Sequence, residues 1–181
     1  ANFEAKEAGS PMSARAVLST FSDEPDWGMD KALWTYTEYG YGLIPYGKET
    51  GTSSQAAFHM LFAHENWLVK KFAPEILDGM PMERLELATR LSSVAFKVGS
   101  RYWGYRFLAW GLHYIQDIGQ PYHSKAVPSA DAWYYLKFVI SRDKPGIKKA
   151  TTQLVQNRHF AYEDFVAFGL QQSFFDKKLR L

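Results

Sequence analysis

Cysteine is absent from this chain of 181 residues. Its absence excludes disulfide bonds and thiolate metal sites, so any transition metal must be held by His, Asp or Glu. Neither sign of charge is in excess, because 21 Lys and Arg residues stand against 19 Asp and Glu residues. This near-balance removes the electrostatic basis for nonspecific nucleic-acid binding, and we expect no stable nucleic-acid complex.

Long apolar runs are also missing from the sequence. No stretch approaches the roughly 18 apolar residues of a membrane-spanning helix, and no basic segment followed by an apolar one marks an export signal near the start. No segment alternates apolar and polar residues as a half-buried strand does. Since the length suits one domain, we expect a soluble, single all-α domain over residues 1–181.

Apolar residues instead recur at helical spacing in several regions, most of them bounded by a capping residue, a proline or a glycine. Ser10 followed by Pro11 predicts the start of the first helix, whereas Pro81 and Gly99 predict the two ends of the third. A capping-box pattern at Thr52–Gln55 predicts the start of the second helix. The predicted helices cover residues 10–21, 52–71, 81–99, 102–119, 130–140 and 148–175.

Aromatic residues gather in two places. The segment 22–51 shows no sustained periodicity and is rich in Gly, Pro and Tyr, which predicts a long ordered loop. Its rings either line a cleft or lipid surface or anchor the loop to the core; they are Trp27, Trp34, Tyr36, Tyr39, Tyr41 and Tyr46. A second cluster is predicted to lie in the core, namely Trp103, Tyr105, Phe107 and Trp110.

The segment GLHYIQDIGQPYH, residues 111–123, places three polar groups in apolar surroundings. His113 and Asp117 are four residues apart and therefore share one helical face, and His123 follows shortly after. The segment HFAYE repeats the same spacing with His159 and Glu163. One such pair alone is typical of a solvated helix surface. Two pairs and a further His favour a metal site, because zinc accepts imidazole nitrogen and carboxylate oxygen from facing helices.

These two segments resemble the central motif and the downstream His and acidic pair of the zinc-dependent phospholipase C and P1/S1 nuclease superfamily. The resemblance covers about residues 23–168 and implies a helical bundle that holds a cluster of zinc ions. It implies one metal bound by His113 and Asp117, with Asp117 bridging to another. It implies a second metal bound by His123, His159 and Glu163. The acid at the last position favours the phospholipase C branch.

The first metal also needs an upstream acid and an upstream His. The resemblance favours Asp26, with Asp23 and Asp30 as alternatives, and it favours His59 over His64. The two histidines are five residues apart, so on one helix they point about 140° away from each other and only one reaches the cluster. An acid left unassigned, Asp23 or Asp30, either positions the attacking water or caps the loop.

The resemblance implies phosphodiester hydrolysis by a zinc-activated water, most simply phospholipase C-type cleavage of a phospholipid head group, with Asp26 and Asp117 as catalytic carboxylates. The alternatives are a single-strand nuclease of the P1/S1 type and a zinc-containing binding domain with little catalysis. Two or three zinc ions are expected. In the family a third ion is held by an amino-terminal Trp and a nearby His, whereas here Ala1 stands first and no His precedes His59. The native amino terminus is therefore expected to be missing or the site reduced.

The resemblance has further implications for partners and location. Its members act on phospholipid or other phosphodiester substrates, so we expect transient contact with a membrane surface. We also expect a monomer. Family members are usually exported, which implies a secreted or periplasmic location although no signal peptide is visible in these residues.

Overall fold

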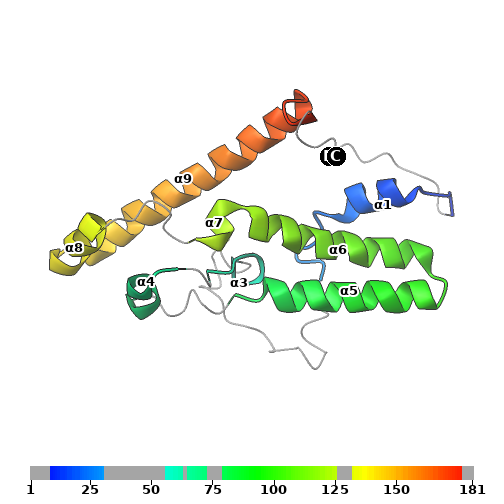
Figure 1. Cartoon of the computed structure of the whole chain (residues 1–181), viewed down its shortest axis with the longest axis horizontal. Helices are drawn as coiled ribbons and strands as arrows, with labels where there is room; N and C mark the ends of the chain where they lie inside the picture. Colours follow the sequence, from blue (N-terminus) through cyan, green and yellow to red (C-terminus); the bar gives the residue numbers. More distant parts are fainter. Residues whose placement is uncertain (1–8, 31–55, 63–64, 73–78, 126–131, 177–181) are drawn as a thin grey trace.

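The computed structural model describes residues 9–30, 56–62, 65–72, 79–125 and 132–176, and every regular element within these ranges is a helix (Figure 1). The all-α prediction is confirmed for this part of the chain. None of its helices is long and apolar enough to cross a membrane. The helices are α1 (Ala14–Phe21), α3 (Ala56–His59), α4 (Trp67–Phe72), α5 (Pro81–Lys97), α6 (Arg101–Gly119), α7 (Pro121–Ser124), α8 (Ala132–Ile140) and α9 (Lys144–Gln171).

The helices α5 and α6 form an antiparallel pair that carries most of the core (Figure 1). Pro81 begins α5, and Gly99 turns the chain with a φ of +81°, a conformation that a side chain would strain; both predicted ends are confirmed. Small residues let the two helices approach closely. A Cβ on Gly104 would lie 2.6 Å from the ring of Phe96, and the Ser92 hydroxyl donates a 2.8 Å hydrogen bond to the Gly104 carbonyl.

The short helix α1 packs on α6 through buried Val17. Its first residue is Ala14 and not the predicted Pro11, because the Ser13 side chain caps the helix by accepting a 3.1 Å hydrogen bond from the Ala16 amide. The prediction of the start was therefore three residues early. Residues 22–30 follow as a series of turns, whereas the rest of the predicted loop, including its rings from Trp34 to Tyr46, lies outside the described residues.

The aromatic cluster of α6 is only partly in the core, contrary to the prediction. Trp110 is 6% exposed, but Trp103 is 44% exposed and Tyr105 and Phe107 are half-buried. The reason is that α5 and α1 contact α6, and neither covers the side that presents Trp103 to solvent. Trp103 instead lies against the guanidinium of Arg106 at 4.9 Å.

The single helix predicted from 52 to 71 is wrong, because α3 ends at His59 and α4 begins only at Trp67. The amide of Leu61 donates a 2.8 Å hydrogen bond to the carbonyl of His123 and is therefore lost to a continuous helix. Gly79 packs against the same break, since a Cβ there would lie 1.9 Å from the Met60 carbonyl oxygen. The predicted capping box at 52–55 lies outside the described residues.

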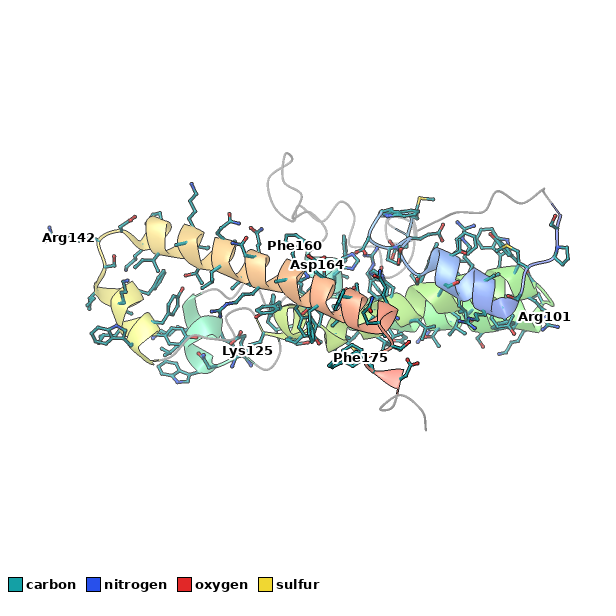
Figure 2. The ribbon with its side chains drawn as sticks, turned by 90° about the horizontal axis from the view of Figure 1, so that it is seen from above. Arg101, Lys125, Arg142, Phe160, Asp164 and Phe175 are labelled. Carbon is teal, nitrogen blue, oxygen red and sulfur yellow. The ribbon has the colours of Figure 1, made fainter. Side chains whose placement is uncertain are left out.

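The helices α8 and α9 form a second pair, which extends away from the α5–α6 pair (Figure 1). Figure 2 shows Arg142, at the turn between α8 and α9, at the opposite end of the molecule from Arg101, at the turn between α5 and α6. Asp143 caps α9 by accepting a 2.9 Å hydrogen bond from the Gly146 amide, so α9 begins four residues before the predicted position of 148.

Candidate metal centre

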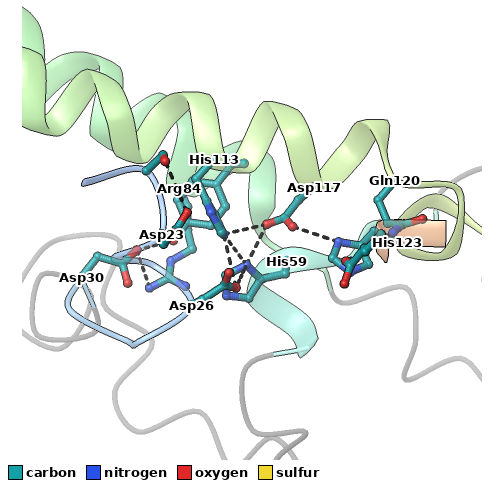
Figure 3. A network of polar contacts seen from close by, with 12 residues as sticks. Asp23, Asp26, Asp30, His59, Arg84, His113, Asp117, Gln120 and His123 are labelled. Atoms are coloured by element: carbon teal, nitrogen blue, oxygen red, sulfur yellow. Dashed lines mark hydrogen bonds and ion pairs between the residues drawn. The ribbon is translucent and has the colours of Figure 1, made fainter. Parts of the chain in front are cut away.

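Three separate segments bring four ligand-type side chains together at one end of the α5–α6 pair (Figure 3). His113 and Asp117 lie one turn apart on α6, as their spacing predicts. His59 is the last residue of α3, and Asp26 lies on the turn that follows α1. Only the His113–Asp117 pair is local in sequence, so the other two side chains reach it through the fold.

The distances among these four side chains suit a shared cation. His59 Nδ1 lies 2.7 Å from Asp117 Oδ2 and 3.0 Å from His113 Nε2, and His113 Nε2 lies 3.1 Å from Asp117 Oδ2. Asp26 Oδ1 lies 3.5 Å from His113 Nε2 and 3.7 Å from His59 Nδ1. Ligand atoms around tetrahedral zinc are about 3.3 Å apart, and the five separations lie on both sides of this value.

Hydrogen bonds alone cannot satisfy both ring nitrogens of His59 in this arrangement. A neutral imidazole nitrogen either donates one proton or accepts through one lone pair, yet His59 Nδ1 faces both an oxygen of Asp117 and a nitrogen of His113. His59 Nε2 is buried without a hydrogen-bond partner among the residues that the structure describes. The side chains present therefore fit a cation, which accepts lone pairs from His59 Nδ1, His113 Nε2 and Asp117 Oδ2 at once.

Burial differs sharply within this first group. His59, His113 and Asp117 are largely buried, whereas the side chain of Asp26 is 62% exposed. Burial alone would raise the pKa of Asp117, but its contacts with His113, His123 and His59 hold that pKa well below the usual range. Burial likewise opposes protonation of His113, but the hydrogen bond to Asp117 and the nearby carboxylates raise its pKa overall.

A second group consists of His123 on α7 and His159 and Glu163 on α9. His123 Nε2 lies 3.1 Å from His159 Nε2, and His159 Nε2 lies 2.7 Å from Glu163 Oε1. Gln120 donates a 3.3 Å hydrogen bond from its side-chain amide to Glu163 and so orients that carboxylate. The predicted spacing in HFAYE thus places both α9 side chains on one face, opposite His123.

Asp117 lies between the other members of the first group and His123 (Figure 3). Its Oδ2 faces His59 and His113, and its Oδ1 lies 3.0 Å from His123 Nδ1. The other nitrogen of that imidazole faces the second group. A carboxylate that contacts the remote nitrogen of a metal-binding imidazole orients the ring and raises its basicity. Asp117 can therefore act on both groups at once.

The three candidates for the upstream acid differ in what their carboxylates contact. The ligand atoms of Asp26, His59 and His113 all lie within 4.8 Å of one another. Asp23 is instead exposed and accepts a 3.3 Å hydrogen bond from Ser22. Asp30 is buried against the guanidinium of Arg84 at 2.9 Å (Figure 3). His64 lies outside the described residues, so the choice between the two histidines rests on the position of His59 alone.

Several residues around the site carry no signal at the level of sequence. Gln120 looks like an ordinary turn residue, although it follows the last helical residue of α6 at a position suited to a cap. Glu24 and Arg106 are 82 residues apart, and Asp30 and Arg84 are far apart as well, yet each pair forms an ion pair. An isolated buried charge is costly, so such partners become recognisable only once the segments have docked.

No protein-family model matches this chain, and no curated protein or solved structure matches it significantly. Two groups of three or more ligand-type side chains occur within the described ranges, whereas residues 1–8 lie outside them. The expectation of two or three ions therefore stays a prediction.

Proposed function

We propose that this protein is a zinc-dependent phosphodiester hydrolase that cleaves phospholipid head groups in the manner of a phospholipase C. The observation that supports the proposal is the convergence of Asp26, His59, His113 and Asp117 from three segments at separations of 2.7 to 3.7 Å. Nitrogen and oxygen ligands in this ratio are typical of hydrolytic zinc sites. Zinc bound there would supply a nucleophilic water at neutral pH and stabilise charge on the phosphoryl oxygens.

In the proposed site, the buried side chains would hold the metal and the exposed one would meet water and substrate. His59 and His113 are buried and would hold the cation together with buried Asp117, whose other oxygen lies next to His123. Asp26 is the exposed member, so substrate and water approach from its side. An Asp26 oxygen at the open side can also accept a hydrogen bond from the attacking water and align it with phosphorus.

An exposed apolar face on α8 favours a lipid substrate over a nucleic acid. Trp133 is 70% exposed, Ile140 is 69% exposed, and Leu136 between them is also exposed. At helical spacing these three side chains share one face of α8. Trp at the edge of an apolar face is typical of helices that lie in a membrane interface, where the ring is apolar and its N–H remains hydrated.

Basic residues lie on α8, in the turn after it and at the start of α9. The segment 132–149 contains five basic residues and one acid, Asp143, so its net charge is +4. All five basic side chains are exposed; they are Lys137, Arg142, Lys144, Lys148 and Lys149. Each Lys or Arg near an anionic leaflet contributes about 1 kcal/mol of attraction. The combination of exposed apolar side chains and positive charge therefore fits an anionic lipid surface.

The choice of substrate is tested by comparing turnover of a chromogenic phosphocholine diester with degradation of single-stranded DNA, both after zinc loading. We expect the diester to be hydrolysed at least about a hundredfold faster, because a difference of about 2.7 kcal/mol in transition-state binding suffices. Faster degradation of DNA would identify a nuclease instead. Turnover of neither substrate by the zinc-loaded protein would identify a binding domain and contradict the proposed activity.

The lipid-facing role of α8 is tested with vesicles. The double substitution Trp133→Ser and Ile140→Ser should weaken binding to phosphatidylserine-containing vesicles by about tenfold or more, since burial of each apolar side chain contributes up to about 2 kcal/mol. Val98→Ser is the matched control, because Val98 is 73% exposed near the opposite end of the molecule and should leave binding unchanged. Equal sedimentation of the double variant and the control with vesicles would contradict the assignment.

A further inference from the structure

Asp26 is an exposed acid on a compact turn, and its position within the first group depends on how that turn is held. The turn closes on itself through backbone hydrogen bonds, among them those from the amides of Trp27 and Met29 to the Glu24 carbonyl, each 3.1 Å long. Gly28 adopts a φ of +70°, which the reversal of the chain requires. Two buried acids flank Asp26 on this turn, Glu24 on one side and Asp30 on the other.

Glu24 anchors the turn to α6. Its carboxylate accepts hydrogen bonds from Arg106 Nε at 2.8 Å and from Arg106 Nη2 at 2.5 Å, and a third from Trp110 Nε1 at 2.7 Å. The paired contact with Arg106 fixes orientation as well as distance. Arg106 and Trp110 lie on the stripe of α6 that continues to His113 and Asp117, because the spacings of four, three and four residues follow the helical repeat.

Asp30 anchors the other end of the turn to both α5 and α6. It accepts a hydrogen bond from the hydroxyl of Tyr114 on α6, and it pairs at 2.9 Å with Arg84 on α5. The guanidinium of Arg84 also lies 4.0 Å from the ring centre of Phe58, the residue that precedes His59. One buried ion pair therefore joins the turn to the segment that carries the upstream His (Figure 3).

We propose that Glu24 and Asp30 are positioning residues that hold Asp26 against His59 and His113 and thereby set the metal affinity of the first group. The inference rests on the proposed function only in that this group binds a metal. Without the two anchors, the turn must be ordered at the moment of metal binding, and that entropy lowers affinity. Buried partners that orient metal ligands typically change affinity by about 10–100-fold.

The test is a cobalt(II) titration followed by visible absorption, in full-length protein that carries His159→Ala so that only the first group is intact. We expect Glu24→Gln and Asp30→Asn each to weaken cobalt binding by about 10–100-fold. Arg106→Met removes the partner of Glu24 on α6 and should weaken cobalt binding by the same factor. Glu86→Gln is the matched control, because its ion pair with Arg90 is exposed on α5 and should leave the affinity within about twofold.

A thermodynamic cycle separates positioning from general damage. In an Asp26→Asn background the positioned carboxylate is gone, so Glu24→Gln should change cobalt affinity by less than about twofold. An undiminished effect in that background, or affinities equal to the Glu86→Gln control in the original background, would overturn the positioning role alone. Failure of the protein with both groups intact to bind cobalt would overturn the proposed function as well, so the two failures are distinguishable.

Discussion

Asp117→Asn should lower phosphodiesterase activity by about a thousandfold or more and reduce the bound metal. Loss of one preorganised electrostatic group at a reacting centre typically costs about 10²–10³-fold. Asp117 contacts histidines of both ligand groups, because its Oδ2 contacts His59 and His113 while its Oδ1 lies 3.0 Å from His123. The amide of asparagine has nearly the same shape but no negative charge, so the change removes electrostatics and keeps packing.

The measurement pairs initial rates on the chromogenic diester with elemental analysis of the same samples. Asp164→Asn serves as the control, since it removes one exposed carboxylate from α9 beside Glu163 and belongs to neither ligand group. We expect this control to keep its activity and its metal content. Full metal stoichiometry in Asp117→Asn would show that Asp117 does not link the two groups, whatever happens to the rate.

Removal of metal should lower the melting temperature by about 5–11 °C. A ligand that binds only the folded state at about 100 times its dissociation constant contributes about 2.7 kcal/mol, and a chain of this size shifts by about 2–4 °C per kcal/mol. The ligand groups lie on α3, α6, α7, α9 and the turn at Asp26, so cations bound to them would link segments that otherwise share few contacts. Without bound cations, the lone pairs of these imidazoles and carboxylates point at one another, which is unfavourable.

The pH dependence of this difference has a definite sign. In the metal-free protein the pKa of His113 is raised, so His113 stabilises the fold below its unfolded pKa of about 6.5 and loses this contribution as the pH rises through its folded pKa. Metal binding requires the neutral imidazole, so protonation of His113 at lower pH also weakens metal binding. We therefore expect the stabilisation by metal to shrink as the pH falls towards 6.

Differential scanning calorimetry with and without chelator, at several pH values, measures both effects. The variant His113→Ala provides a comparison in which the first group is broken, and its chelator-induced shift should be much smaller. An unchanged melting temperature after verified removal of metal would contradict the coupling between the cation and the fold. A shift that grows towards acidic pH would contradict proton competition at the imidazoles.

The two i, i+4 pairs could be predicted from the sequence because helical geometry is local. His113 with Asp117, and His159 with Glu163, needed only a helix over each segment to lie on one face. The prediction that only one of His59 and His64 reaches the cluster depends on one helix from 52 to 71, and that helix is wrong. The position of His59 depends instead on the end of α3 and on the contact between Leu61 and His123.

The sequence by itself determined the chemistry that is available: no thiolates, a near-balance of charge, and paired imidazoles and carboxylates at helical spacing. The tertiary structure decided which acid joins them. Asp23, Asp26 and Asp30 lie within eight residues of one another and look alike in sequence, yet Asp23 contacts Ser22, Asp26 faces His113, and Asp30 is buried against Arg84. The reason is that the docking of the turn on α5 and α6 depends on partners more than fifty residues away, and no local pattern encodes such contacts.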